Sequence, residues 1–528
     1  MGAPQHDLAR HRLTARPHRP AGPALSAIAC AALHLAAGEA FASSGLADLI
    51  QAGESSAALA TIEAGADVNA AQGDGTTPLH WAVYRGDVAL VDALLAAGAR
   101  ADVVNLYGAS PLSEAVKIGH AGLVERLLAA GADPESPNAD GQTALMLAAR
   151  AGATGVAQVL VRHGADVNAR ERWRGQTALM WAADSSAAGI VKLLVARGAD
   201  VEARAFANDW PTQVTSEPRG QYRPTGGMTA LLYAARSGCT ECAAAILDAG
   251  ADIDRPSPDG VTPLMIAIDN FRFDTAKLLL ERGANPHHSD WWGRTALYIA
   301  VDMSSFTGRG PARRNAPEDG DATALDIVRA LLEADVDPNT QLNMHRPGRG
   351  GNSGRFIDDL MTTGATPLLR AAIGVDVEAV RLLLEHGALV DLPNVMGVTP
   401  LMAAAGIGVT ARDRAGVAGD VEDRVIETLD VLLGAGADIH ARVTDTTSRT
   451  ARIARPSTMT DREGQTALYG AIRFGWERVV QYLIERGAEV DIVDALGRSP
   501  VDQALGRVGG RGDVVSERVA EILRAAGA

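Results

Sequence analysis

The sequence predicts an all-α solenoid in which short helix pairs stack side by side. First, the octet at residues 75–82, Gly-Thr-Thr-Pro-Leu-His-Trp-Ala, returns along the chain, and most neighbouring copies begin 33 residues apart. Second, each copy precedes a segment with paired leucines that ends in Gly-Ala-Asp or a close variant. Third, hydrophobic residues make up 47% of the chain but aromatic residues only 4%, which favours cores of Ala, Leu and Val. The copies open at Gly75, Gly108, Gly141, Gly175, Gly227, Gly260, Gly293, Gly364, Gly397, Gly464 and Gly497.

The octet has the residue order of a turn followed by a helix start. A Gly closes the turn, a Thr caps the first free N–H groups, and Pro supplies the helical φ at the first position. Leu79 and Ala82 lie three apart on one helical face, and the small Ala lets a neighbouring helix approach closely. A Gly one turn later, such as Gly86, ends this first helix.

A second helix follows, with the pattern Val-Asp-Ala-Leu-Leu at residues 91–95, and it stops at Gly98. The tail Gly-Ala-Asp-Val-Asn, as at residues 65–69, is rich in turn formers and leads to the next octet. One pair of this size is too small to bury an adequate core, so its stability must come from stacking on its neighbours.

Together, the Gly-x-Thr-Pro-Leu-His-x-Ala string, the paired leucines and Gly-Ala-Asp-Val-Asn resemble the ankyrin repeat. The eleven copies and a degenerate opening unit from about residue 45 to 73 imply an ankyrin-repeat solenoid of about twelve helix-turn-helix repeats with hairpin fingers and long loop insertions. The chain departs from the family in two ways. The Pro is often Ala, and the family's His survives only at His80. These changes affect the hydrogen bonds that the His makes in the family, but they do not affect the expected fold.

Residues 1–42 have the three parts of a secretory signal. Four arginines precede an apolar run at residues 24–37, and Ala-Phe-Ala follows at residues 40–42. We therefore expect a signal peptide over 1–42, a solenoid over 43–528, and a periplasmic or secreted protein with no membrane span in the mature chain. The alternative is a disordered Ala-rich leader on a cytoplasmic protein.

Five insertions interrupt the 33-residue period. Three enlarge fingers, at about residues 205–226, 340–363 and 443–463, and two separate the first helix of a repeat from the second, at about 304–321 and 406–421. They are rich in Gly, Pro, Arg, Ser and Thr, so we expect loops with few residues able to form a core. Such loops either bind partners or are tolerated decoration.

The candidate partner-binding residues lie at finger tips, on the inner surface and in the loops. Trp and Arg dominate interface hot spots, although these rings could instead pack on neighbouring fingers. The Gly-rich segment 345–355 has two interpretations. Its arginines bind an anion or a partner, or the segment is only a flexible linker. The predicted residues are Tyr107, Trp173, Arg174, Trp210, Trp291, Trp292, Arg346, Arg349, Arg355, Arg473 and Phe474.

The residues Cys239 and Cys242 are the only cysteine pair downstream of the leader. One pair cannot complete a tetrahedral zinc site, and no thioredoxin-like pattern surrounds it, so a local disulfide and two structural thiols remain as alternatives.

We expect no metal site, no catalytic residues and no cofactor. The formal net charge of −15 disfavours nucleic acid as a partner.

We therefore expect an exported, non-catalytic protein–protein interaction scaffold whose partner and oligomeric state the sequence does not identify. One alternative is a small-molecule or enzymatic site built by the loops around residues 304–363, with His345, Arg349 and Asp358 converging. A second is a secreted effector that binds host proteins. A third is binding of acidic polymers by the arginine-rich loop.

Overall fold

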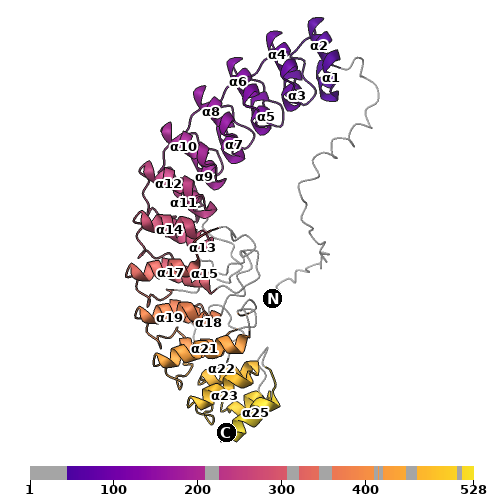
Figure 1. Ribbon diagram of the computed structural model, residues 1–528. Coiled ribbons are helices and arrows are strands. Elements are labelled where there is room, and N and C mark those ends of the chain that lie inside the picture. The colour runs from indigo at the N-terminus through magenta and orange to yellow at the C-terminus, as the bar shows by residue number, and fades with distance from the viewer. Residues whose placement is uncertain are drawn as a thin grey trace, which may run out of the picture.

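A computed structural model describes residues 45–208, 225–305, 320–343, 360–409, 414, 420–446, 459, 461–507 and 514–528. Over these residues, twelve helix pairs stack into a long arc (Figure 1). The first helix of each pair lies on the concave side and the second on the convex side. The predicted all-α solenoid of about twelve repeats is therefore confirmed. The predicted leader lies outside the described residues.

The helix bounds follow the octets. The inner helices are α1 (Leu46–Ala52), α3 (Pro78–Tyr84), α5 (Pro111–Lys117), α7 (Ala144–Ala151), α9 (Ala178–Asp184), α11 (Ala230–Ser237), α13 (Pro263–Asp269), α15 (Ala296–Ser304), α18 (Pro367–Gly374), α20 (Pro400–Ala405), α22 (Ala467–Phe474) and α24 (Pro500–Ala504). The outer helices are α2 (Ser55–Glu63), α4 (Val88–Ala96), α6 (Ala121–Ala129), α8 (Thr154–Arg162), α10 (Ala188–Ala196), α12 (Thr240–Asp248), α14 (Phe273–Glu281), α17 (Ala324–Glu333), α19 (Val377–Glu385), α21 (Val421–Gly434), α23 (Glu477–Glu485) and α25 (Glu517–Ala525).

The inner helices begin and end as their residues dictate. Thr366 caps α18 by accepting a hydrogen bond from the Leu369 amide at 3.0 Å, and Pro367 occupies the first helical position. Gly152 ends α7 in the left-handed region, with φ of 65°. Where this Gly is missing, Ser186 takes the same role after α9 with φ of 56°, a conformation that strains a residue with a Cβ.

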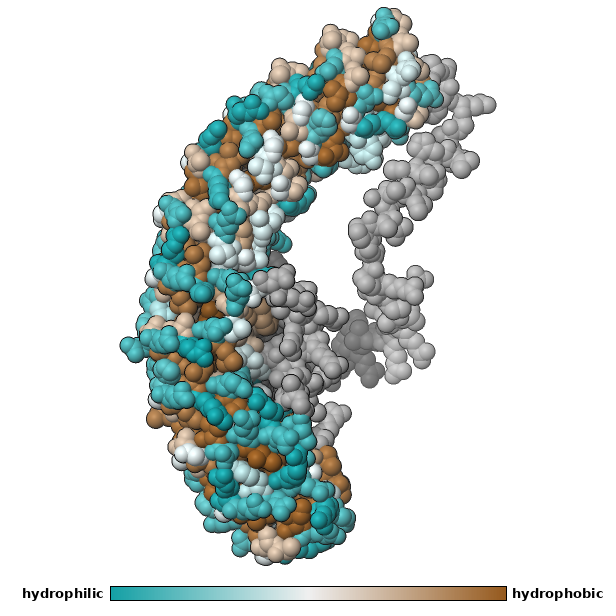
Figure 2. All heavy atoms as spheres, viewed as in Figure 1, coloured by the Kyte–Doolittle hydropathy of each residue, from teal (hydrophilic) through white to brown (hydrophobic). Residues whose placement is uncertain are grey.

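One apolar core runs the length of the arc, from Leu46 in α1 to Leu523 in α25. Leu79 and Leu94 are fully buried within one repeat, and Ala82 is buried where its helix meets the next. Each fully buried Leu contributes about 1.5–3 kcal/mol of hydrophobic stabilisation. Figure 2 shows hydrophilic side chains along much of the convex outline, with apolar residues between neighbouring helices. Among the described helices, none has both the length and the apolar composition needed to cross a bilayer.

The fingers are narrow hairpins that project from the helix pairs. In a regular finger the Gln72 amide donates to the Thr76 carbonyl at 2.9 Å. The enlarged fingers keep an equivalent closing bond at their base, from Ala205 to Met228, Leu342 to Ala365 and Val443 to Gln465, each at 3.0 Å. In the first of them, β1 (Ala207–Asn208) also pairs antiparallel with β2 (Thr225–Gly226).

In the repeats of His80 and Tyr469, the residue in the octet's His position ties the repeat to the next finger. The Thr77 amide donates to His80 Nδ1 at 3.2 Å, so the neutral ring carries its proton on Nε2, which donates to the Ala109 carbonyl at 3.0 Å. In the penultimate repeat Tyr469 makes the equivalent bond to the Arg498 carbonyl at 2.7 Å. This link survives without His in at least that repeat.

Candidate protein-binding surface

The finger tips are held by polar side chains that bond their own backbone. The Oδ1 atom of Asn105 accepts hydrogen bonds from the amides of Tyr107 at 3.0 Å and Ala109 at 2.9 Å. Successive tips are also linked, since the Leu106 amide donates to the Asp74 carbonyl at 2.9 Å. The tips therefore present their side chains from a fixed backbone.

Three predicted aromatic residues lie exposed on these tips. The exposed fractions are 73% for Tyr107, 72% for Trp173 and 43% for Trp291, and Arg174 is also exposed. Leu106 and Leu496 are further exposed apolar residues on finger tips, and Phe206 is exposed in an enlarged finger; the sequence pattern predicted none of these three. Leu106 stands directly before Tyr107 and two residues ahead of the turn Gly, and this position could have been used to predict that it lies exposed at the finger tip.

The prediction that Trp292 is free for a partner is wrong, because its side chain is only 4% exposed. The Arg294 guanidinium carbon lies 5.2 Å from the ring centroid. The next finger lies against this tip, since the Asn343 amide donates to the Trp292 carbonyl at 2.9 Å. Of the two adjacent tryptophans, only Trp291 faces solvent.

Arg473 is likewise buried, at 4% exposed, and the prediction of a free side chain there is wrong. Its guanidinium donates to the Val409 carbonyl at 2.6 Å. Phe474 is half-buried and stacks on Trp476, with ring centroids 4.3 Å apart. The chain that follows α20 therefore lies over the end of α22. Trp210, Arg346, Arg349 and Arg355 lie outside the described residues, as do His345 and Asp358 of the enzymatic alternative.

A second apolar cluster, which we call the inner cluster, covers the inner helices of the C-terminal half. It joins residues of α15, α18, α20 and α22 to the few apolar residues at the ends of the insertions, which therefore contribute to a core. Its buried members are Tyr298, Leu342, Leu360, Met361, Ala365, Leu369, Ile373, Met396, Val398, Met402, Ala403, Ile407, Val409, Val443, Met459 and Tyr469.

Buried arginines accompany the inner cluster and are used structurally. Arg370 Nε donates to Asp302 Oδ1 at 2.5 Å. Arg414 donates to the carbonyls of Ile373, Ala403 and Ala404 at 2.7–3.2 Å, so it caps the ends of α18 and α20. In this half, the described inner surface is occupied by the chain's own side chains.

The inner surface from α7 to α11 differs, because its arginines are accessible. Arg150, at the end of α7, is exposed, and its guanidinium carbon lies 5.0 Å from the Trp181 ring centroid. Arg172 and Arg174 are exposed on the neighbouring finger. Tyr233 of α11 accepts a hydrogen bond from Gln176 at 2.6 Å, and burial raises the pKa of its hydroxyl.

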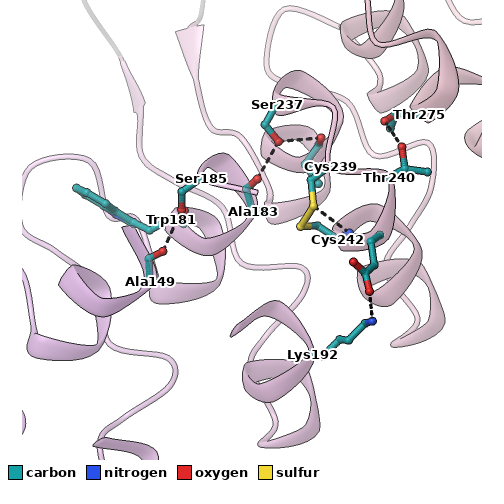
Figure 3. Close-up of a disulfide and its surroundings, with 12 residues drawn as sticks. Ala149, Trp181, Ala183, Ser185, Lys192, Ser237, Cys239, Thr240, Cys242 and Thr275 are labelled. Carbon is teal, nitrogen blue, oxygen red and sulfur yellow. Dashed lines mark hydrogen bonds and ion pairs between the residues drawn. A yellow bond between two sulfur atoms is a disulfide. The ribbon is translucent and has the colours of Figure 1, made fainter. Parts of the chain in front are cut away.

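The cysteine pair lies at the turn between α11 and α12 (Figure 3). Cys239 is the N-cap of α12 and Cys242 stands three residues on, with Cα atoms 5.1 Å apart, and the two form a disulfide. The Cys242 amide also donates to Cys239 Sγ at 3.2 Å. Both side chains are buried, and the disulfide closes the first turn of α12.

The described residues bring together no group of three or more His, Cys, Asp or Glu side chains that could hold a metal ion. Buried carboxylates have structural partners instead. Burial raises the pKa of Asp290, while Arg294 opposes that shift through an ion pair at 2.6 Å and the amides of Trp292 and Arg294 donate to Asp290.

Comparisons with known proteins agree with this architecture. Models of ankyrin repeats match residues 33–138, 112–205 and 214–290 as three-repeat arrays, and residues 363–395 and 463–495 as single repeats. The Ankyrin repeat and SAM domain-containing protein 6 of Danio rerio is 31% identical over 168 residues, which are 31% of this chain and 22% of that protein. The B-cell lymphoma 3 protein homolog of Mus musculus is 33% identical over 137 residues, 25% of this chain and 26% of that protein.

The matched segments thus span about a quarter of these two relatives' length. Among solved structures, the human ASB11 ankyrin repeat domain aligns with 46% of this chain and all of that chain, at 25% identity and a TM-score of 0.38. The repeat motif, the helix pairs and the family matches lead to one conclusion: this chain belongs to the ankyrin-repeat proteins.

Proposed function

We propose that this chain is an exported, non-catalytic scaffold that binds a protein partner through its finger tips and the open part of its inner surface. The exposure of Tyr107 and Trp173 on backbone fixed by hydrogen bonds carries the proposal. Because their side chains lie outside the core, the stack does not depend on them. Large, rigid aromatic side chains lose little conformational entropy on binding and supply much of the affinity at protein interfaces.

Two observations support export. Residues 1–42 combine a basic segment, an apolar run and Ala-Phe-Ala, as a secretory signal does. The disulfide between Cys239 and Cys242 suits an oxidising compartment. Fractionation of the native cells and N-terminal sequencing tests this part: we expect the mature chain outside the cytoplasm, beginning at Ser43. A cytoplasmic chain that keeps residues 1–42 would refute export.

The proposal that the chain is non-catalytic is supported by the structural bonds that its buried carboxylates make. Asp302 is paired with Arg370, and Asp290 is held by Arg294 and backbone amides. These buried acids stabilise the solenoid's inner surface and finger backbone. The repeats therefore offer a recognition surface in which the charged groups that look catalytic already have structural duties.

Binding is tested by capture of partners from the native compartment with three forms of the chain. The first is the wild type, the second carries Tyr107→Ala, Trp173→Ala and Trp291→Ala, and the third carries the control Leu389→Ala, since Leu389 is exposed away from the finger tips. We expect the triple variant to lose the captured protein and the control to retain it, with unchanged circular dichroism in both. Equal capture by all three forms would refute binding at the finger tips.

A further inference from the structure

We infer that the surface formed by Arg150, Arg172, Trp173, Arg174 and Phe206, which we call the arginine patch, binds an acidic segment of the partner protein. The inference rests on the proposed function and specifies the chemistry of the partner. It predicts carboxylates that contact the arginines and an apolar side chain that packs on the exposed rings of Trp173 and Phe206.

The patch is one continuous surface across neighbouring repeats. The Phe206 amide donates to the Arg174 carbonyl at 2.6 Å, which places its ring beside the finger that carries Trp173. A Cβ built on Gly175 would lie 2.6 Å from that ring. Arg172 lies against Gly141 of the preceding finger, where a Cβ would be 3.1 Å from the Arg172 Cβ.

The arginines of the patch have no carboxylate partner among the described residues. Neither Arg172 nor Arg174 makes a side-chain hydrogen bond there, and the interaction of Arg150 is with the Trp181 ring. Several arginines on the convex side are neutralised, as Arg126 is by Asp92 and Arg282 by Asp248, both at 2.7 Å. In the C-terminal half Arg370 and Arg473 are buried and bonded, whereas the patch gathers exposed arginines beside exposed aromatic rings.

Glu171, within the same finger, does not satisfy these arginines. Its carboxylate is buried and accepts from the backbone amides of Trp173 at 2.6 Å, Arg174 at 2.7 Å and Gln176 at 3.0 Å. At this tip the Glu171 carboxylate thus faces the backbone, while Arg172 and Arg174 face solvent. Guanidinium groups beside aromatic rings match a carboxylate-rich segment with apolar anchors.

A hydrogen-bond donor at the edge of the patch is also without an acceptor. The indole N–H of Trp181 is buried and meets no acceptor among the described residues, whereas Trp81, at the same place in its repeat, donates to Gln72 at 2.8 Å. Glu171 occupies the position of Gln72 in the finger before α9, and its oxygens serve the backbone instead. The one carboxylate at this tip is therefore used within the finger, and the exposed arginines of the patch are left to bind carboxylate oxygens of the partner.

A protein segment suits this surface better than a nucleic acid does. The chain carries a formal net charge of −15, which repels a long polyanion that runs along the solenoid. A short acidic segment bound at the patch interacts electrostatically mainly with the patch, because charges more than about 8 Å away are screened at physiological ionic strength.

The probe is a fluorescein-labelled peptide of about twelve residues, in which Glu alternates with Gly around one Leu and one Phe. When extended it spans at most about 40 Å. Binding to the full chain is followed by fluorescence anisotropy. We expect saturable binding that weakens at least about 10-fold when every Glu is replaced by Gln, and again as salt is raised. A Gln peptide that binds as tightly as the Glu peptide would overturn the inference.

The variant Arg172→Glu with Arg174→Glu tests the location. Its matched control is Arg197→Glu with Arg524→Glu, which changes the net charge equally at exposed arginines outside the patch. We expect at least about a 10-fold loss for the patch variant and less than about 2-fold for the control. Equal losses would show that only net charge matters, and tighter binding of an oligothymidine of similar length would favour a nucleic acid; either result contradicts the inference.

The same variants separate the two proposals. If the peptide fails to bind but the finger-tip alanine variant still loses the native partner, the acidic-segment inference is wrong and the scaffold proposal stands. If the finger-tip variant retains the partner, the scaffold proposal itself is wrong. Trp173→Ala should weaken binding of the peptide without changing the midpoint of thermal unfolding. An unchanged affinity would contradict the packing of an apolar side chain on the Trp173 ring.

Discussion

The hydroxyl of Tyr469 donates to the Arg498 carbonyl oxygen at 2.7 Å and also lies 2.6 Å from the Ile492 carbonyl oxygen. This phenol does for the penultimate repeat what His80 Nε2 does for an early one, where it lies 3.0 Å from the Ala109 carbonyl. Burial raises the Tyr469 pKa well above that of free tyrosine, so the hydroxyl stays a donor at physiological pH. A different side chain thus preserves the bond between a repeat and the next finger.

Tyr469→Phe should lower the free energy of unfolding by about 1–3 kcal/mol, because two buried carbonyls lose their shared donor. Tyr482→Phe is the matched control, since the Tyr482 hydroxyl donates to Asp430 Oδ1 at 2.8 Å in an exposed pair. Denaturant unfolding of both variants checks this. A larger loss at Tyr482 than at Tyr469 would contradict the assigned role.

His80 should make the N-terminal repeats pH-sensitive. Burial lowers its pKa from 6.5, so the folded state prefers the neutral ring and the unfolded chain takes up the proton at higher pH. The stability from neutral His80 is therefore complete above about pH 6.5 and is lost as the pH falls through the folded-state pKa.

Hydrogen exchange of α1 and α3 between pH 7.5 and 5.5 measures this effect, after correction for the intrinsic pH dependence of exchange. The variant His80→Met places there the residue that Met146 and Met180 supply in other repeats. We expect protection of the wild type to decrease toward acid pH more than that of the variant. An identical pH dependence in the two proteins rules out the role given to His80.

Ser186→Gly should stabilise the stack by about 0.5–1 kcal/mol. Ser186 is exposed and has φ of 56°, where Gly avoids the strain that a Cβ brings. Gly152→Ser is the reverse exchange at the same turn of the preceding repeat, with φ of 65°, and should destabilise by a similar amount. Thermal unfolding of both variants shows whether each substitution raises or lowers the stability. Stabilisation by Gly152→Ser would disprove the strain argument.

Trp291→Ala and Trp292→Ala should behave differently although the residues are adjacent. Trp291 is 43% exposed and Trp292 is 4% exposed with Arg294 beside its ring. We expect Trp292→Ala to lower the free energy of unfolding by about 3–5 kcal/mol and Trp291→Ala to change it little. Equal losses in a denaturant titration would show that both rings support the fold.

Local residue order was enough to predict the repeats. The period of the octets, the Thr caps and the turn glycines each act within a few residues, so Thr366 and Gly152 behave as their neighbours dictate. Exposure at the finger tips was predicted for Tyr107 and Trp173 by the same reasoning. It failed at Trp292, because the burial of that ring depends on Arg294 and on the following finger.

The inner cluster could not be predicted from periodicity. Leu360, Ile407 and Met459 are apolar residues near the ends of polar insertions, and neither a helical nor a strand period marks them. They become part of a core because the inner helices present Tyr298 and Tyr469 to them. The burial of Arg473 has the same origin, since its acceptor, the Val409 carbonyl, belongs to an insertion.

Site-specific photo-crosslinking tests the central claim most directly. A benzoyl-phenylalanine placed at Trp173, on the finger tip before α9, is compared with one placed at Arg197, after the outer helix of the same repeat. The account predicts that the Trp173 position crosslinks one protein partner in the native compartment and the Arg197 position does not. Equal crosslinking from both positions, or none from Trp173 while the partner still binds, would contradict it.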